Sequence, residues 1–290
     1  MEENMPLQQL VQYFNDRFEV EHQSNIRPFI LEKGLVSGIF GPIQISSVFD
    51  AVRRTDDNEK LSGHIAQLSV TPYDNNQHSQ QSIEIGDLLT DVITQPADFQ
   101  SIISLDRLCR TVHMLNYLTY SNKGGVLFLD VDPRHILGIK QDHGAYFEEI
   151  IIKCGLATQN IVISMAVNSF YALHHAQLLD GLNNYRQRGY QIALNIGSLY
   201  AAHGLRDLIN KVSANYLRIS APDTATIQHS NSNWLLTLNA LTELQRLIGG
   251  QTILQQVKQK NQADIAISAR FNLAQGDYYD KLVTDHLRCL

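Results

Sequence analysis

The stretch "GGVLFLDVDPRHIL" (residues 124–137) places carboxylates directly after an apolar strand. Two glycines lead into the apolar run Val126–Leu129, which predicts a buried strand over residues 125–131. The strand ends in Asp130-Val131-Asp132-Pro133. Carboxylates at the end of a buried strand are typical of an active site at the mouth of an α/β barrel, so this stretch indicates a fold and a candidate site together.

The same kind of apolar run recurs on both sides of this stretch, separated by segments with helical spacing. Strands are predicted over residues 44–49, 63–70, 125–131, 160–167, 190–196, 215–219, 251–254 and 264–268. Helices are predicted over residues 105–118, 145–154, 170–188, 203–212 and 233–248. Buried strands regularly spaced by helices indicate parallel βαβ units, and this many in one chain favour a closed TIM-like (β/α) barrel.

The N-terminal segment has a different pattern. Apolar residues recur there at the spacing of an amphipathic helix: Leu7, Leu10, Val11, Phe14 and Phe18. We therefore predict an N-terminal helical arm over residues 1–40 and one barrel domain over residues 41–290. Residues 71–82 contain almost no apolar side chain and are predicted to form a solvated loop.

Composition excludes several classes of protein. The chain has 290 residues, of which 44% are hydrophobic, and this is enough for a sizeable core. A net charge of −6 without a Lys/Arg cluster argues against a nucleic-acid surface. No apolar run approaches the roughly 20 residues of a membrane span, and the N-terminus MEENMPLQQL lacks the apolar region of a secretory signal, so we expect a cytoplasmic protein.

The cysteines give no sign of a metal site. The chain has three cysteines, Cys109, Cys154 and Cys289, which lie far apart and form no CxxC pair. Neither a zinc site nor a disulfide framework is expected, and buried free thiols are the simpler interpretation.

Eight short strings stand in the order of the motifs of one known family. From about Val48 to the C-terminus the chain resembles the EAL domain, a barrel-shaped phosphodiesterase module that hydrolyses the bacterial second messenger cyclic di-GMP. The strings are SVFDAV (47–52), SGHIAQLS (62–69), LFLDVDP (127–133), VISMAV (162–167), GYQIALNIG (189–197), NYLRIS (215–220), TILQQVK (252–258) and FNLAQGDYY (271–279).

The resemblance also assigns site positions. In the family, carboxylates at the barrel mouth hold two divalent cations, usually Mg²⁺ or Mn²⁺, which activate a water molecule. By this resemblance Ile65 stands at the glutamate of EAL, Asp130 at the asparagine of LFINLSP, Ser164 at the metal-binding glutamate of ExxE, Asn195 and Ile196 at the paired aspartates of DDFG, Arg218 at the lysine of KID, Gln255 at the glutamate of AEGVE and Gln275 at the unchanged glutamine of QGY/F.

These replacements remove the groups that would hold the metals. Asp130 is the one carboxylate introduced at these positions, and Arg218 stands beside it as a permanent cation. A cluster with a formal charge near −1 next to an arginine does not concentrate two dications. We therefore expect no catalytic residues, no metal site and no cofactor in the degenerate pocket.

Two hypotheses about function follow, with a third less favoured. The leading one is a non-enzymatic regulatory module that contacts a protein partner, or a second copy of itself, in bacterial cyclic di-GMP-related signalling such as motility or biofilm control. The alternative is a receptor that binds but does not hydrolyse cyclic di-GMP, with Asp130, Arg218 and Gln275 as binding residues. Asp50 and Ser69, at positions of a family glutamine and arginine, oppose a dianionic ligand. An active phosphodiesterase is the third hypothesis.

The vacated mouth gives one structural prediction. Because an unpaired buried charge is costly, we predict that Asp130 and Arg218 face the same cavity and neutralise each other, directly or through a water molecule. Asn195, Gln255 and Gln275 are expected nearby as neutral hydrogen-bond partners. In the alternative arrangement, Arg218 turns to solvent and Asp130 bonds only backbone amides.

Overall fold

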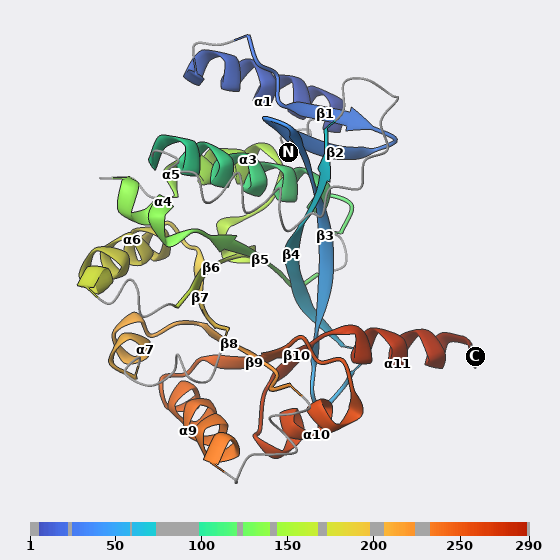
Figure 1. Cartoon of the computed structure of the whole chain (residues 1–290), viewed down its shortest axis with the longest axis vertical. Coiled ribbons are helices and arrows are strands. Elements are labelled where there is room, and N and C mark those ends of the chain that lie inside the picture. The colour runs from blue at the N-terminus through green and yellow to red at the C-terminus, as the bar shows by residue number, and fades with distance from the viewer. Residues whose placement is uncertain are drawn as a thin grey trace.

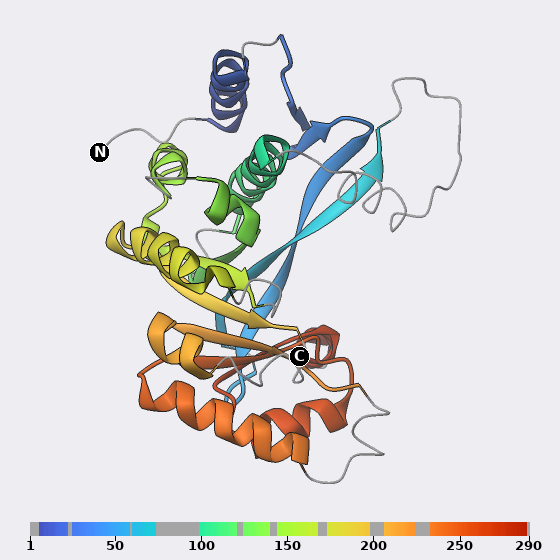
Figure 2. The same ribbon diagram turned by 60° about the vertical axis from the view of Figure 1, so that its left-hand side comes forward.

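A computed structural model of the chain describes residues 6–22, 25–58, 60–73, 99–120, 124–139, 144–167, 173–197, 206–223 and 233–288. These residues form one mixed sheet with helices packed around it (Figures 1 and 2). Ten strands belong to the sheet: β1 (Phe29–Glu32), β2 (Leu35–Phe40), β3 (Ile43–Arg54), β4 (Leu61–Pro72), β5 (Val126–Val131), β6 (Ile161–Ala166), β7 (Gln191–Ile196), β8 (Tyr216–Ser220), β9 (Gln251–Gln255) and β10 (Leu273–Gln275).

Eight of these strands close into a barrel. The strand order is β1-β2-β3-β10-β9-β8-β7-β6-β5-β4, and a further pairing of β3 with β4 joins the ends of the last eight. Strands β4 to β10 are parallel to one another, whereas β3 is antiparallel to both of its barrel neighbours. The side chains that end the parallel strands are therefore gathered at one mouth of the barrel.

Helices follow the strands and cover the outside of the barrel. They are α3 (Phe99–Tyr117), α4 (Pro133–Gly138), α5 (Ala145–Lys153), the short 3₁₀ helix η2 (Thr158–Asn160), α6 (His175–Gln187), α7 (Arg206–Val212), α9 (Asn233–Leu247), α10 (Lys260–Ser268) and α11 (Asp277–Arg288). The helices and the outward faces of the strands share one large apolar core. Gly155 (φ 68°) and Gly189 (φ 89°) follow α5 and α6 in the left-handed conformation that ends a helix.

The β3–β4 hairpin is longer than the barrel. Each strand has 12 residues; β3 pairs with β10 through residues 52–54 and with β2 through residues 43–45. The hairpin therefore extends past the mouth into an antiparallel sheet with β1 and β2 (Figure 1). Helix α3 packs on this sheet, and the N-terminal helix α1 (Leu7–His22) packs against β1.

The structure confirms the barrel with alternating helices and the N-terminal helix, and it corrects two details. Strands β1 and β2 lie within residues 29–40; β1 pairs with β2 and β2 pairs with β3, so the sheet continues across residue 40. The division into two domains stays a prediction. Residues 264–268, predicted as a strand, lie in helix α10. Ile265 and Ile267 alternate as in a strand, but the buried residues Gln262, Ala263, Ile265 and Ala266 follow helical spacing.

Two further observations concern the loop predicted over residues 71–82 and the character of the helices. Strand β4 continues to Pro72, so the predicted loop begins after it, and residues 74–82 lie outside the described part of the chain. Among the helices that the structure describes, none has the length and apolar character needed to cross a membrane.

Candidate functional site

The inside of the barrel is apolar one layer below the mouth. Ile65 is fully buried there, and its neighbours on the flanking strands are Asp50 of β3 and Phe128 of β5. The residues of this inner layer are Val52, Ile65, Phe128, Val162, Ala193, Ile253 and Leu273. Ile65 is thus part of the barrel core.

Arg218 lies at the centre of the mouth. Only 2% of its side chain is exposed. Its Nη1 donates to Asp130 Oδ1 at 2.6 Å and to Ser164 Oγ at 2.6 Å, and its Nε donates to Gln255 Oε1 at 3.1 Å. One guanidinium therefore joins the ends of strands β5, β6, β8 and β9.

Gln255 extends this arrangement to β7. Its Nε2 donates to Asn195 Oδ1 at 2.7 Å and to Ser220 Oγ at 3.1 Å, while its Oε1 accepts from Arg218. We call Asp130, Ser164, Asn195, Arg218 and Gln255 the mouth network. Its members come from five neighbouring strands, and Ser220 adds a bond that the sequence did not predict.

Gln275 makes a separate set of contacts. Its Oε1 accepts from the backbone N–H of Gln256 at 3.0 Å, and its Nε2 donates to Asp50 Oδ2 at 3.1 Å. Burial, together with the charges of Asp280 and Asp277, raises the pKa of Asp50 above its ordinary value. Gln275, at the end of β10, therefore links Gln256, the residue after β9, to Asp50 of β3.

The predicted contact between Asp130 and Arg218 is confirmed, but its two ends differ in exposure. The Asp130 side chain is 49% exposed, so water reaches the carboxylate, whereas Arg218 is buried. Asn195 and Gln255 lie in the network as predicted, while Gln275 forms no hydrogen bond with it in the described part of the chain.

The donor set does not fit a pair of Mg²⁺ or Mn²⁺ ions. Such ions prefer several anionic oxygen ligands, but the mouth network contains one carboxylate, and one of its oxygens accepts from the guanidinium. A cation at this place would lie against Arg218. Among the residues that the structure describes, no group of three or more His, Cys, Asp or Glu side chains is arranged to hold a metal.

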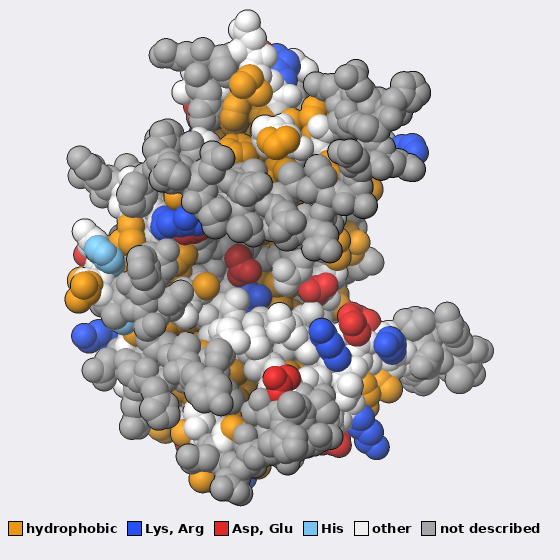
Figure 3. Space-filling model, viewed as in Figure 1, with side chains coloured by type: hydrophobic (Ala, Val, Ile, Leu, Met, Phe, Trp, Pro, Cys, Tyr) orange, Lys and Arg blue, Asp and Glu red, His pale blue; other side chains and the backbone are white. Residues whose placement is uncertain are grey.

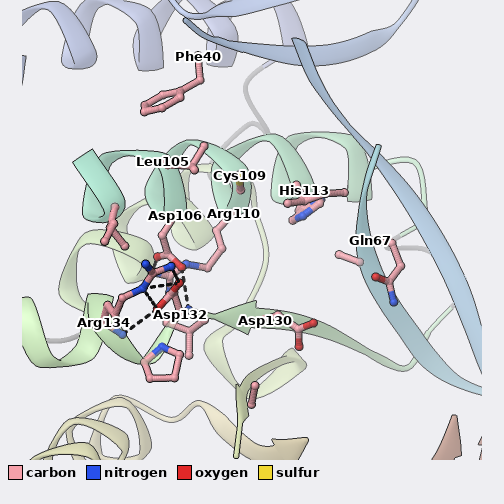
Figure 4. A pocket seen from close by; sticks show the side chains of 16 residues that line it. Phe40, Gln67, Leu105, Asp106, Cys109, Arg110, His113, Asp130, Asp132 and Arg134 are labelled. Carbon is pink, nitrogen blue, oxygen red and sulfur yellow. Dashed lines mark hydrogen bonds and ion pairs between the residues drawn. The ribbon is translucent and has the colours of Figure 1, made fainter. Parts of the chain in front are cut away.

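A cavity of about 460 Å³ lies next to the mouth network. Helix α3 forms one side of it, and the ends of β4 and β5 with the start of α4 form the other (Figure 4). The residues that line it are Phe40, Ala66, Gln67, Leu68, Ile102, Leu105, Asp106, Cys109, Arg110, His113, Asp130, Val131, Asp132, Pro133, Arg134 and Ala166. We call it the α3 cavity. Asp130 belongs both to the cavity and to the mouth network.

A buried ionic cluster holds one end of the α3 cavity together. Asp106 of α3 forms an ion pair with Arg110, lies 3.0 Å from His135 Nδ1, and accepts from the backbone N–H of Asp132 at 3.2 Å. Burial opposes the charge of Asp106, but Arg110 and His135 outweigh it and hold the pKa of this carboxyl below its ordinary value. Arg110 also donates to Tyr185 at 3.2 Å, so the cluster ties α3 to α4 and α6.

The sequence did not predict this cluster. Asp106 and Arg110 stand four residues apart within the helix predicted at 105–118, and this spacing is a usable signal for an ion pair. His113, one turn further along α3, forms a hydrogen bond between Nδ1 and Ser47 Oγ at 2.8 Å. Burial lowers the pKa of His113 from 6.5 to about 4, so its ring is neutral at pH 7.

Comparison of the sequence with protein-family models and with curated proteins finds no match. The fold, in contrast, is similar to several solved structures. One is the Bacillus subtilis YkuI protein, with an EAL domain, in complex with cyclic di-GMP and calcium: TM-score 0.61, 17% identity, 81% of this chain and 54% of that chain covered. Another is Klebsiella pneumoniae BlrP1 in a calcium and cyclic di-GMP complex: TM-score 0.64, 12% identity, 86% and 57% covered.

An EAL domain protein from Listeria monocytogenes EGD-e is similar as well, with a TM-score of 0.56 and 9% identity over 81% of this chain and 86% of that chain. This chain thus spans little more than half the length of the YkuI and BlrP1 chains. At these identities the similarity is one of fold. With the closed eight-strand barrel and its antiparallel β3, the comparisons lead to one conclusion: the chain has the fold of EAL domains.

Proposed function

We propose that this chain is an EAL-type barrel without hydrolytic activity, which acts as a regulatory module by contacting another protein in bacterial cyclic di-GMP-related signalling, such as the control of motility or biofilm formation. The observation that carries the proposal is the position of Arg218. Its buried guanidinium donates to Asp130, Ser164 and Gln255, at the strand ends where the resemblance expects metal ligands.

The chemistry of the mouth network supports the loss of activity. Two-metal hydrolysis needs two dications held together so that they can activate water and stabilise the developing charge. Arg218 contributes a positive charge and no lone pair for a metal ion. Ser164, Asn195 and Gln255 are neutral, so they do not offset a second positive charge.

A hydrolysis assay tests this proposal. The purified chain is incubated with cyclic di-GMP and either Mg²⁺ or Mn²⁺, and the linear dinucleotide is measured by chromatography, with an active EAL phosphodiesterase as the positive control. We expect no product above a buffer blank. Turnover that EDTA abolishes, and that Arg218→Ala leaves intact, would contradict the proposal.

A cyclic di-GMP receptor is the second candidate, and one observation favours it. The α3 cavity is flanked by residues 66–68 and 130–133, which belong to two of the strings that resemble family motifs. Against it stand the charges: Asp130 and Asp132 line the cavity. On the face seen in Figure 3, the Lys and Arg side chains of the described residues lie among Asp and Glu and form no basic patch.

Calorimetric titration with cyclic di-GMP separates the two candidates. The regulatory module should give no saturable heat at micromolar nucleotide, with or without Mg²⁺. Saturable binding would favour the receptor. Sedimentation of the same sample shows whether a second copy of the chain is a partner.

A further inference from the structure

The α3 cavity has the size and walls of a small-molecule site. Its volume of about 460 Å³ lies within the range of roughly 300–1,000 Å³ that ligand pockets occupy. Apolar side chains make up most of its walls: Phe40, Ala66, Leu68, Ile102, Leu105, Cys109, Val131, Pro133 and Ala166. Such walls favour a largely apolar molecule.

The ionic groups of the cavity are not spread evenly. Figure 4 shows Asp106, Arg110, Asp132 and Arg134 gathered at one end, where Arg134 pairs with Asp132 at 2.7 Å and Arg110 pairs with Asp106. These charges are satisfied by one another. The end near Asp130 is therefore the place where a ligand finds a charged group facing it.

Asp130 has capacity left for a ligand. One of its oxygens, Oδ1, accepts from Arg218, and its side chain is 49% exposed. Among the described residues, none donates a hydrogen bond to its Oδ2. A carboxylate accepts several hydrogen bonds, so Oδ2 can accept from an amidinium or amine while Oδ1 stays with Arg218.

The same group disfavours anions. A phosphate or carboxylate placed at this end would face the lone pairs of Asp130, and His113 beside it is neutral because burial lowers the pKa of its ring to about 4. Arg218 points its donors at Asp130, Ser164 and Gln255. These bonds use its Nε and Nη1 within the mouth network, and Arg218 is not among the residues that line the cavity.

We infer that the α3 cavity binds a mostly apolar molecule with a cationic, hydrogen-bond-donating head, and that Asp130 recognises this head. The expected ligand carries a positive charge, whereas a phosphodiester carries a negative one. This inference concerns a small molecule and does not depend on whether the barrel also contacts a protein partner.

Benzamidine is a suitable probe, because it joins one aromatic ring to one amidinium. Benzoate has the same shape with the opposite charge and serves as the matched control ligand. Both are titrated against the full chain and followed by ligand-observed NMR. We expect benzamidine to bind at least about tenfold more tightly than benzoate.

Three variants locate the binding. Ala166→Phe adds bulk at an exposed position of the cavity wall and should abolish binding of benzamidine. Ala157→Phe makes the same change at an exposed alanine outside the cavity and should leave binding unchanged. Arg218→Gln removes the cation that competes for Asp130 and should tighten benzamidine binding severalfold.

The outcomes are decisive in both directions. Binding of benzamidine that is lost in Ala166→Phe and stronger in Arg218→Gln supports the inference. For so small a ligand we expect a dissociation constant of roughly 1 mM. The inference is overturned if benzamidine does not bind at 20-fold this concentration. It is also overturned if benzoate binds equally tightly, or if Ala166→Phe leaves the binding of benzamidine unchanged. Circular dichroism of every variant verifies that the fold is intact.

Discussion

Removing the charge of Asp130 should destabilise the protein more than its exposed position indicates. Asp130→Asn keeps the shape of the side chain but leaves Arg218, which is 2% exposed, without a counter-charge. Removing one partner of a buried ion pair is costly because the other charge stays buried. The stranded charge is that of Arg218, since Asp130 itself reaches water.

The size of the effect follows from the contacts. A stranded buried charge costs about 3–5 kcal/mol when nothing compensates it. Arg218 keeps two neutral acceptors, Ser164 Oγ at 2.6 Å and Gln255 Oε1 at 3.1 Å, so we expect a loss near the lower bound, about 3 kcal/mol. Arg218→Gln alone leaves a hydrated Asp130 and should cost about 1–2 kcal/mol. The double variant should cost no more than Arg218→Gln alone.

Equilibrium unfolding in urea measures these differences as free energies of unfolding. Asp16→Asn is the matched control, because Asp16 pairs with Arg27 at 2.6 Å on the surface, with 57% of its side chain exposed. Such an exposed pair contributes about 1 kcal/mol or less. A loss in Asp130→Asn no larger than in Asp16→Asn, or additive losses in the double variant, would mean that Asp130 does not neutralise a buried Arg218.

Three further predictions concern the barrel and its surroundings. Ile65→Glu places a carboxylate in the apolar inner layer and should lower the free energy of unfolding by about 3 kcal/mol or more, against about 1 kcal/mol for Ile65→Val; equal losses would mean that water reaches this layer. His113 has a lowered pKa of about 4, so on acidification the unfolded state binds a proton before the folded state does, and stability falls as the pH drops from about 6.5 towards 4. His113→Gln should reduce this slope by up to about 1.4 kcal/mol per pH unit. Parallel curves of stability against pH for the unchanged chain and for His113→Gln would contradict this prediction. Gly276 has φ 145°, and an added Cβ would lie 2.3 Å from Val257 O, so Gly276→Ala should lower the free energy of unfolding by about 2 kcal/mol or more. Gly197→Ala is the control, because a Cβ added there meets no atom within 4 Å. Similar thermal melts for the two variants would contradict the expected clash.

The fold could be predicted from the sequence where the apolar pattern was unambiguous. The strands over residues 125–131, 160–167 and 190–196 are near the observed bounds, because parallel strands are buried on both faces and appear as continuous apolar runs. The prediction for residues 264–268, which lie in the 9-residue helix α10, was wrong for the opposite reason. In so short a segment, two isoleucines two residues apart give the alternation of a strand. Strands β1 and β2 were not predicted, because residues 1–40 were interpreted as one helical arm.

Some features of the candidate site could likewise be predicted from the sequence, and others could not. The contact of Asp130 with Arg218 could be predicted, since both residues end barrel strands and buried charges need partners. Their unequal exposure could not, because it depends on how the mouth opens towards the α3 cavity. The ionic cluster of Asp106, Arg110 and His135 joins two segments 25 residues apart, and periodicity within one helix carries no information on such a contact.

If Arg218 and neutral side chains occupy the place of a two-metal site, the chain should not bind Mn²⁺, and a titration with this ion decides the matter. The chain is titrated with Mn²⁺ in the presence of cyclic di-GMP, and electron paramagnetic resonance measures the free ion. We expect the signal of the free ion to rise in proportion to the Mn²⁺ added, both for the unchanged chain and for Asp130→Asn. Two Mn²⁺ ions bound per chain, and fewer bound in Asp130→Asn, would contradict it.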